Sequence, residues 1–187
     1  MIDFARVDFS YGAREVFRGL SFHIDRGARR ALMGPSGRGK TTLLRLTMGL
    51  ERPEAGKVTV NTDRISPLFQ EDRLLPFLTV YENCALFCPD RDRVGEMLSA
   101  LGLSEAAGAL PSALSGGMAR RAALARCLCH EAELYLLDEP FTGLDGDNAR
   151  RAADLVNRVT RGKTLLVVTH SPGEAGWLDC EPMALGV

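Results

Sequence analysis

A glycine-rich stretch followed by a lysine and two threonines is the part of this sequence best suited to bind phosphate. It matches the pattern G-x-x-x-x-G-K-T and reads Gly34-Pro35-Ser36-Gly37-Arg38-Gly39-Lys40-Thr41-Thr42. Glycines let successive backbone N–H groups turn toward an anion, and the N-terminus of a following helix adds partial positive charge. Lys40 supplies a point charge for the β- and γ-phosphates, and the Thr41 hydroxyl is placed to ligate Mg²⁺. The stretch therefore predicts a nucleoside triphosphate site.

Strands and helices must position this loop, and the sequence predicts that they alternate. Residues 1–33 read mostly as β-structure, because apolar and polar side chains alternate there, as in Leu20–Asp25. The later elements are expected to be a helix over 42–49, a helix over 117–129, a strand over 134–137, a helix over 147–160, a strand over 164–169 and at most one short strand within 183–187. This order predicts an α/β fold with a mostly parallel sheet.

Charged side chains and an imidazole follow two of the expected strands. Asp138 and Glu139 end the apolar strand over 134–137, and His170 follows the strand over 164–169. Because ligands of parallel sheets bind at the carboxyl ends of the strands, we expect these residues to share a site with the phosphate loop. Asp138 fits a partner of Mg²⁺, and Glu139 fits the base that polarises an attacking water. Solvated acids at a strand end are the alternative, which the nearby phosphate loop disfavours.

The middle of the chain changes to helical character. Thr79 is expected to cap a helix, and apolar residues recur at helical spacing over 93–101. We expect residues 71–112 to form a small helical subdomain, inserted into a nucleotide-binding core made of 1–70 and 113–187. Together these parts make a single domain.

Composition excludes several other classes of protein. The 187 residues carry a net charge of −1, which provides no field to attract nucleic acid or anionic lipid, and they include five cysteines. There is no apolar run of about 18 residues and no signal peptide, so we expect a cytoplasmic chain. Cys127, Cys129 and His130 could suggest a metal site, but neighbours this close on a helix do not face each other. Reduced, buried thiols are the favoured interpretation.

A second potential anion cradle reads Leu114-Ser115-Gly116-Gly117-Met118. It places a hydroxyl and two glycine N–H groups at the start of a helix, although a serine there can also be a plain helix cap. With this motif the chain resembles the ATP-binding cassette (ABC) ATPases, whose signature is L-S-G-G-Q, and the motifs occur in that family's order. The resemblance implies a P-loop NTPase (RecA-like) core, an N-terminal antiparallel β part and an inserted helical subdomain.

The resemblance also implies roles for matching residues. Tyr11 would stack on adenine, Gln70 would sense Mg²⁺ and the attacking water, and His170 would contact the γ-phosphate. Alone, each has an ordinary structural interpretation. The candidate catalytic residues are therefore Gln70, Glu139 and His170, and the candidate metal-binding residues are Thr41, Gln70 and Asp138. The candidate nucleotide-binding residues are Tyr11, Gly34, Pro35, Ser36, Gly37, Arg38, Gly39, Lys40, Thr41, Thr42, Ser115, Gly116, Gly117, Asp138 and Asp145.

In this family the two anion cradles of one chain serve different nucleotides. The resemblance implies a head-to-tail homodimer that forms on ATP binding, in which Lys40 of one copy and Ser115 of the other hold the same ATP with its Mg²⁺. Asp145 lies in the loop 141–145, which would cross the dimer interface. ATP would close the pair, and hydrolysis by the water that Glu139 orients would loosen it.

The stretch Gln70-Glu71-Asp72-Arg73-Leu74-Leu75-Pro76 is similar to the importer subgroup that serves nitrate, sulfonates and taurine. This similarity implies a separate integral membrane permease, with or without a solute-binding protein, and import of a small solute such as an anion. The chain would then sit in the cytoplasm on the inner face of the membrane. Leu74, Leu75 and Phe77 could form the docking surface or could pack within the subdomain.

Two other classes of protein are alternatives to the importer. A soluble ABC ATPase acting on DNA or ribosomes would have a long coiled-coil insertion or two cassettes in one chain, and this sequence has neither. A phosphate-loop kinase or GTPase would leave Ser115–Gly117 unexplained, and the guanine-reading N-K-x-D element is missing. The chain departs from its family at Met118, where glutamine is usual, at Arg38 inside the phosphate loop, in a short segment over 60–65, and in an end soon after His170 that predicts no regulatory domain.

Overall fold

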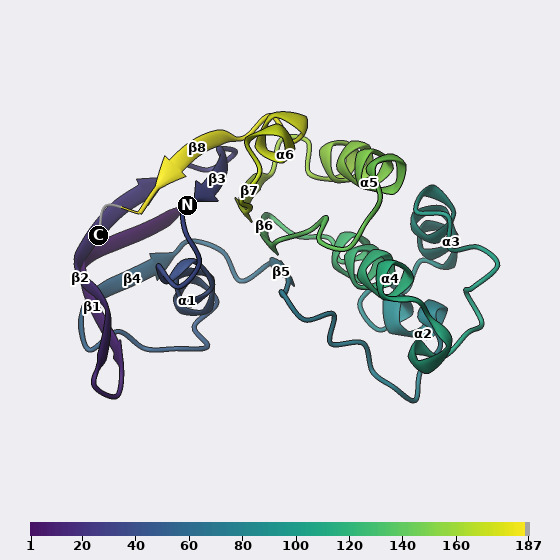
Figure 1. Cartoon of the computed structure of the whole chain (residues 1–187), viewed down its shortest axis with the longest axis horizontal. Coiled ribbons are helices and arrows are strands. Elements are labelled where there is room, and N and C mark those ends of the chain that lie inside the picture. The colour runs from purple at the N-terminus through teal and green to yellow at the C-terminus, as the bar shows by residue number, and fades with distance from the viewer. Residues whose placement is uncertain (186–187) are drawn as a thin grey trace.

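Two β-sheets form the body of the protein in the computed structural model, which describes residues 1–185 (Figure 1). The antiparallel sheet has the order β2-β1-β4, made of β2 (Arg14–Ile24), β1 (Ile2–Tyr11) and β4 (Ala55–Val60). The second sheet is entirely parallel in the order β5-β6-β7-β3-β8 and contains β5 (Ile65–Leu68), β6 (Leu134–Asp138), β7 (Thr164–Val168), β3 (Arg29–Met33) and β8 (Glu181–Ala184). The predicted α/β class, with its N-terminal antiparallel part, is confirmed.

Helices cover the parallel sheet, and most lie where the sequence predicted them. They are α1 (Lys40–Thr47), α2 (Val80–Ala85), α3 (Arg91–Ala100), α4 (Gly116–Cys129), α5 (Gly146–Val159) and α6 (Pro172–Trp177), with a 3₁₀ turn at Pro111–Ala113. Figure 1 shows α2, α3 and α4 grouped at the opposite end of the molecule from the antiparallel sheet. The last strand begins before the predicted range 183–187, and Gly186 and Val187 lie outside the described residues.

The two faces of the parallel sheet are buried in different apolar cores. On β6, Tyr135 and Leu137 belong to the core that includes α4 and α5, whereas Leu134 and Leu136 belong to the core that includes α1 and the antiparallel sheet. Side chains alternate across a strand, so a strand covered on both faces reads as one continuous apolar run. This explains why Leu134–Leu137 shows no polar alternation in the sequence.

The edge strand β5 contains a proline that a central strand would not accept. Pro67 lacks an N–H donor, and within residues 1–185 the strand β5 pairs only with β6. The Ser66 side chain ties this edge to α4, because its hydroxyl donates to the Cys127 carbonyl at 2.7 Å. The strand β5 ends at Leu68, two residues before Gln70.

All five cysteines are buried and unpaired. Burial raises the pKa of the Cys127 thiol to about 12, so this thiol stays protonated at neutral pH. Among residues 1–185, no helix has the length and apolar character needed to cross a membrane.

A capping box fixes the start of α2. The Thr79 hydroxyl accepts a hydrogen bond from the Glu82 N–H at 3.2 Å, and a Glu82 carboxylate oxygen accepts one from the Thr79 N–H at 2.8 Å. These bonds satisfy two donors that the first turn of a helix leaves without partners. The predicted cap at Thr79 is confirmed.

We expect Thr79→Ala to lower the free energy of unfolding by about 1 kcal/mol, because it leaves a helix-end N–H without its acceptor. Urea unfolding followed by circular dichroism measures this. The control is Ser99→Ala, which removes an exposed hydroxyl inside α3 and should change stability by less than about 0.5 kcal/mol. Equal effects of the two substitutions would contradict the role of the cap.

Candidate nucleotide-binding site

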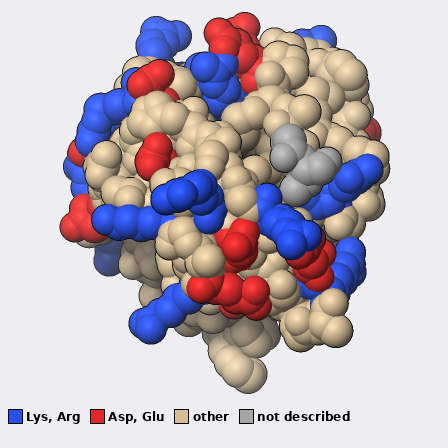
Figure 2. All heavy atoms as spheres, turned by 90° about the vertical axis from the view of Figure 1, so that its left-hand side faces the viewer, with Lys and Arg blue, Asp and Glu red and all other residues tan. Residues whose placement is uncertain are grey.

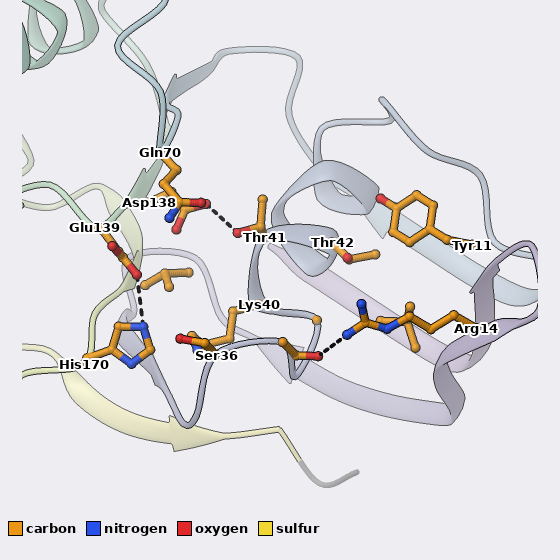
Figure 3. A pocket seen from close by; sticks show the side chains of 14 residues that line it. Tyr11, Arg14, Ser36, Lys40, Thr41, Thr42, Gln70, Asp138, Glu139 and His170 are labelled. Atoms are coloured by element: carbon orange, nitrogen blue, oxygen red, sulfur yellow. Dashed lines mark hydrogen bonds and ion pairs between the residues drawn. The ribbon is translucent and has the colours of Figure 1, made fainter.

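A cavity of about 240 Å³ opens where β3, β6 and β7 end. Predicted residues from five separate parts of the chain line it, namely Tyr11, Ser36, Gly37, Gly39, Lys40, Thr41, Thr42, Gln70, Asp138, Glu139 and His170. Figure 3 shows Glu139 and His170 on one side of Lys40, and Tyr11 with Arg14 on the other. The structure thus brings together residues up to 159 positions apart, from Tyr11 to His170.

The phosphate loop takes a backbone form that only glycine adopts easily. Gly34, Gly37 and Gly39 all have positive φ, at 143°, 80° and 84°. At Gly39 there is also no room for a side chain, because a Cβ would lie 2.7 Å from atoms of Phe17 and Val16. The glycine is therefore required both by backbone conformation and by packing against β2, and α1 begins at the next residue.

Lys40 is held in place by its own loop. Its Nζ donates to the Gly34 carbonyl at 2.7 Å and to the Pro35 carbonyl at 2.8 Å. Burial lowers the pKa of Lys40, and the negative charges of Glu139 and Asp138 oppose that shift. The result is a fixed positive charge beside the loop, which is the chemistry that a phosphate group requires.

Thr41, which is exposed, and Asp138, which is buried, form a hydrogen-bonded pair in the cavity wall. The Thr41 hydroxyl donates to an Asp138 carboxylate oxygen at 2.8 Å. Burial raises the pKa of Asp138, while the Thr41 hydrogen bond opposes the shift. A desolvated carboxylate that faces a hydroxyl is a suitable oxygen ligand set for a hard divalent cation.

Glu139 lies next to Asp138 and contacts His170. Its Oε1 is 2.9 Å from Nε2 of His170, and Thr142 donates to its other oxygen at 3.3 Å. The Glu139 backbone is left-handed, with φ 49°, which costs a non-glycine residue about 1 kcal/mol. The Glu139 N–H donates to the Val168 carbonyl at 2.9 Å, so this strained turn is anchored to β7.

Gln70 and Tyr11 lie on the rim of the cavity. Gln70 follows β5 and lies close to Asp138 (Figure 3). Tyr11 is 45% exposed, packs edge-on against Phe9, and donates to a Glu51 carboxylate oxygen at 3.4 Å. An exposed aromatic face in this position can stack on a planar base.

Several predicted residues do not line this cavity. Ser115 caps α4 by accepting from the Met118 N–H at 3.3 Å, and Asp145 caps α5 by accepting from the Asn148 N–H at 2.9 Å. Gly117 lies against the loop 141–145, since a Cβ on it would be 3.2 Å from the Gly143 carbonyl. The Ser115–Gly117 corner and the loop 141–145 are therefore neighbours, outside the cavity that Lys40 lines.

The remaining phosphate-loop residues act through their backbone or face solvent. Gly34 and Pro35 contribute the carbonyls that hold Lys40. Arg38 is exposed and does not line the cavity.

Two arginines of the site were missed by sequence reasoning. Arg14 pairs with Tyr11 in the β1–β2 hairpin and donates to the Gly37 carbonyl at 3.2 Å. Arg120, buried in α4, donates to backbone carbonyls of the two loops that carry Gln70 and Glu139. The place of Arg14 opposite Tyr11 in the β1–β2 hairpin was a possible signal, whereas nothing in the sequence separates Arg120 from Arg121 and Arg126 on the same helix.

Comparison with known proteins identifies the family. A family profile described as "ABC transporter" matches residues 17–142. The chain belongs to the ABC transporter family. The resemblance found in the sequence is confirmed, and membership makes the chain an ATP-binding protein.

Curated relatives belong to the predicted subgroup of ABC proteins. The aliphatic sulfonates import ATP-binding protein SsuB of Pseudomonas entomophila (strain L48) is 42% identical over 177 residues, which are 89% of this chain and 66% of the relative. SsuB of Granulibacter bethesdensis (strain ATCC BAA-1260 / CGDNIH1) is 42% identical over 180 residues, which are 94% of this chain and 75% of the relative. The chain thus spans about two thirds to three quarters of their length.

Solved ABC structures share the whole fold. The dimeric structure of MJ0796, a bacterial ABC transporter cassette, has a TM-score of 0.88 at 28% identity and covers 100% of this chain and 95% of its own. A dimeric post-hydrolysis state of MJ0796 bound to ADP and Pi has a TM-score of 0.87 at 27% identity, covering 99% of this chain and 94% of its own. Both of these ABC cassettes are dimers.

The buried charge of Asp138 leads to a pH-dependent prediction. Asp138→Asn keeps an acceptor for Thr41 and removes the charge. Because the folded-state pKa lies above the unfolded value of about 4, ionised Asp138 destabilises the fold increasingly as pH rises between these two values, and constantly above them. Without nucleotide, the variant should be more stable than the wild type at about pH 7, and the gain should shrink toward about pH 4. Urea unfolding across this range measures it.

Asp145→Asn is the control with the opposite sign. Hydrogen bonds from Asn148 lower the pKa of Asp145, so its charge stabilises the fold above the unfolded pKa, and this stabilisation is lost as pH falls. This variant should be less stable than the wild type at neutral pH. A change of the same sign in both variants would contradict the assignment of burial as the cause at Asp138.

Proposed function

We propose that this chain is the ATP-hydrolysing subunit of an ABC importer and drives a separate membrane permease. The observation that carries the proposal is the cavity in which Lys40, the Thr41–Asp138 pair and the Glu139–His170 pair face one another. The names of the relatives, which are sulfonate import proteins, favour import over action on DNA or ribosomes. A small sulfonate-like anion is the proposed solute.

Nucleotide binding is assigned to the loop and the rim. Backbone N–H groups of the phosphate loop and the Lys40 ammonium would hold the β- and γ-phosphates, and Tyr11 would stack on adenine. Arg14, which lies beside Tyr11 and bonds to the loop at Gly37, would hold the loop in its binding conformation. These groups bind and orient the triphosphate and do not react with it.

The residues beside the phosphate positions fit Mg²⁺. Thr41, Gln70 and Asp138 offer a hydroxyl, an amide and a carboxylate oxygen, which are the ligands that this hard cation prefers. When bound, the ion would offset the negative charge of the β- and γ-oxygens. Asp138 is suited to this role because its charge is already desolvated.

Water activation is assigned to Glu139. Its carboxylate would accept a hydrogen bond from the attacking water and orient that water toward the γ-phosphorus, and ADP and phosphate would be released. His170, whose Nε2 lies 2.9 Å from the Glu139 carboxylate, would hold the carboxylate and contact the γ-phosphate.

The Ser115–Gly117 corner is assigned to the nucleotide of a second copy. The corner does not line the Lys40 cavity, so it would not contact a nucleotide bound there in the same chain, and this supports the assignment. ATP would then join two copies head to tail, with the same surface used twice. Asp145 and its loop, which lie next to the corner, would be part of that interface.

The permease would dock on the helical subdomain, for which we propose the range 71–112. Phe77 is 90% exposed and Leu75 46%, whereas Leu74 packs against the core. A groove of about 320 Å³, lined mainly by apolar side chains that include Phe69, Leu75 and Phe87, continues this surface. Large exposed apolar residues of this kind mark contact sites. The chain would work in the cytoplasm at the inner face of the membrane, with a solute-binding protein as a further partner.

The face of the molecule that carries the antiparallel sheet gives no support for a nucleic-acid partner. Figure 2 views the side that carries the antiparallel sheet, and basic and acidic side chains are interspersed there. On the described part of that face, no large area of one charge sign is seen.

The dimer is tested with Glu139→Gln. This variant should accumulate as an ATP-bound dimer, because the water loses its base while the groups that hold ATP remain. Gel filtration with light scattering in the presence of MgATP measures the mass. A variant that stays monomeric would count against the proposal.

Two further variants in the same background separate the halves of the site. Adding Lys40→Ala should abolish the dimer together with nucleotide binding. Adding Ser115→Arg should abolish the dimer while leaving the affinity of the monomer for ATP unchanged, because Ser115 lies outside the Lys40 cavity. Calorimetry measures that affinity, and a persistent dimer with Ser115→Arg would refute the head-to-tail arrangement.

The permease contact is tested with Phe77→Asp. Burial of a phenylalanine contributes about 1.5–3 kcal/mol, so the variant should recover at least about tenfold less membrane protein in a pull-down from native membranes. Its ATPase rate in isolation should not change. Leu50→Asp, at an exposed apolar residue outside residues 71–112 and outside this groove, is the control and should recover wild-type amounts.

A further inference from the structure

Arg120 is a buried arginine in the first half of α4, whereas Arg121 and Arg126 on the same helix are only half-buried. The exposure of Arg120 is 4%, and its guanidinium contacts two loops that flank the nucleotide cavity. Nη1 donates to the carbonyls of Phe69 at 2.7 Å and Gln70 at 3.2 Å, and to the Asp72 carboxylate at 3.1 Å. These three bonds go to the loop that follows β5.

The other nitrogen of the same guanidinium holds the loop that follows β6. Nη2 donates to the carbonyl of Asp138 and, at 2.7 Å, to the carbonyl of Glu139. Because the guanidinium is planar and rigid, it fixes the spacing between the backbone at Gln70 and the backbone at Glu139. Within residues 1–185, no other side chain forms hydrogen bonds to both loops.

The Glu139 backbone needs such support. Its φ of 49° is unfavourable for a side chain with a Cβ, and strain of this kind persists only where the surroundings determine it. On one side the Glu139 N–H bonds to Val168 of β7, and on the other its carbonyl bonds to Arg120. Loss of Arg120 would free the carbonyl side of a turn that aims the carboxylate.

We propose that Arg120 is a positioning residue that fixes the Glu139 carboxylate and Gln70 relative to each other and thereby sets the rate of hydrolysis without contacting the nucleotide. The inference rests on the proposed function, because the position of Glu139 matters for rate only if Glu139 orients the water. It goes beyond that function by assigning this control to a side chain of α4.

Arg126 provides a matched comparison on the same helix. It donates to the carbonyls of Asp72 at 2.8 Å and Arg73 at 2.7 Å, so it supports the same β5 loop and has no recorded bond to the Glu139 loop. A substitution of Arg126 removes hydrogen-bond donors to two backbone carbonyls of this loop and leaves the bonds of the Glu139 turn in place.

The first experiment separates rate from binding in the full-length chain. Arg120→Gln should lower kcat about a hundredfold, the loss expected when a catalytic group is misplaced by about 1 Å, with little change in the dissociation constant of ATP. The kcat of Arg120→Lys should lie between those of Arg120→Gln and the wild type, because an ammonium keeps the charge but does not reach both loops. Arg126→Gln should keep kcat within about threefold of wild type.

The second experiment is a double-mutant cycle with Glu139→Gln, read by single-turnover release of labelled phosphate. If Arg120 acts through Glu139, then Arg120→Gln should cause little further loss once Glu139 is substituted. Equal proportional losses in both backgrounds would overturn the proposal and make Arg120 merely structural. If Arg120→Gln does not fold, Arg120→Lys serves in the same cycle.

The outcomes also separate this inference from the proposed function. A wild-type rate in Glu139→Gln would refute the assignment of Glu139 itself. A wild-type rate in a folded Arg120 variant, while Glu139→Gln is inactive, would refute only the role of Arg120.

Discussion

The parallel pairing of β3, β7 and β6 is the constraint on which the site depends. Parallel neighbours end at the same edge of a sheet, so the phosphate loop, His170 and the Asp138–Glu139 pair come together although they are far apart in the chain. Both faces of these strands are buried, one against α1 and the antiparallel sheet and the other against α4 and α5. A shift of register would misplace the apolar side chains of both cores at once, so packing also fixes the ends of the strands.

Most of the fold could be predicted because its signals are local. The loop over 34–42, the cap at Thr79 and the continuous apolar run of β6 each depend on a few neighbouring residues. The order of strands and helices then leaves few possible arrangements for a parallel sheet. For the site, the same logic predicts that the strand-end residues lie together, and the cavity contains them.

What could not be predicted depends on distant contacts. Arg14 reaches Gly37, and Arg120 reaches carbonyls of residues that lie about fifty positions earlier in the chain. A backbone carbonyl has no sequence identity, so no residue pattern reveals such bonds. The left-handed turn at Glu139 is similar, since the surrounding bonds impose it and its residue type does not. The same reason applies to the segment around Phe77, because only tertiary packing separates Leu74, which contacts the core, from the exposed Leu75 and Phe77.

The two carbonyl bonds of Lys40 have a consequence for how tightly an anion is held. An ammonium has three donors, and two of them are occupied by Gly34 and Pro35, which leaves one to meet an incoming oxygen. The four-carbon side chain is thereby ordered when the protein folds. Its loss of rotamer entropy therefore lowers the free energy of unfolding and does not lower the affinity for the anion. Pre-organisation of this kind makes affinity at the loop a property of the folded chain, set before any ligand arrives.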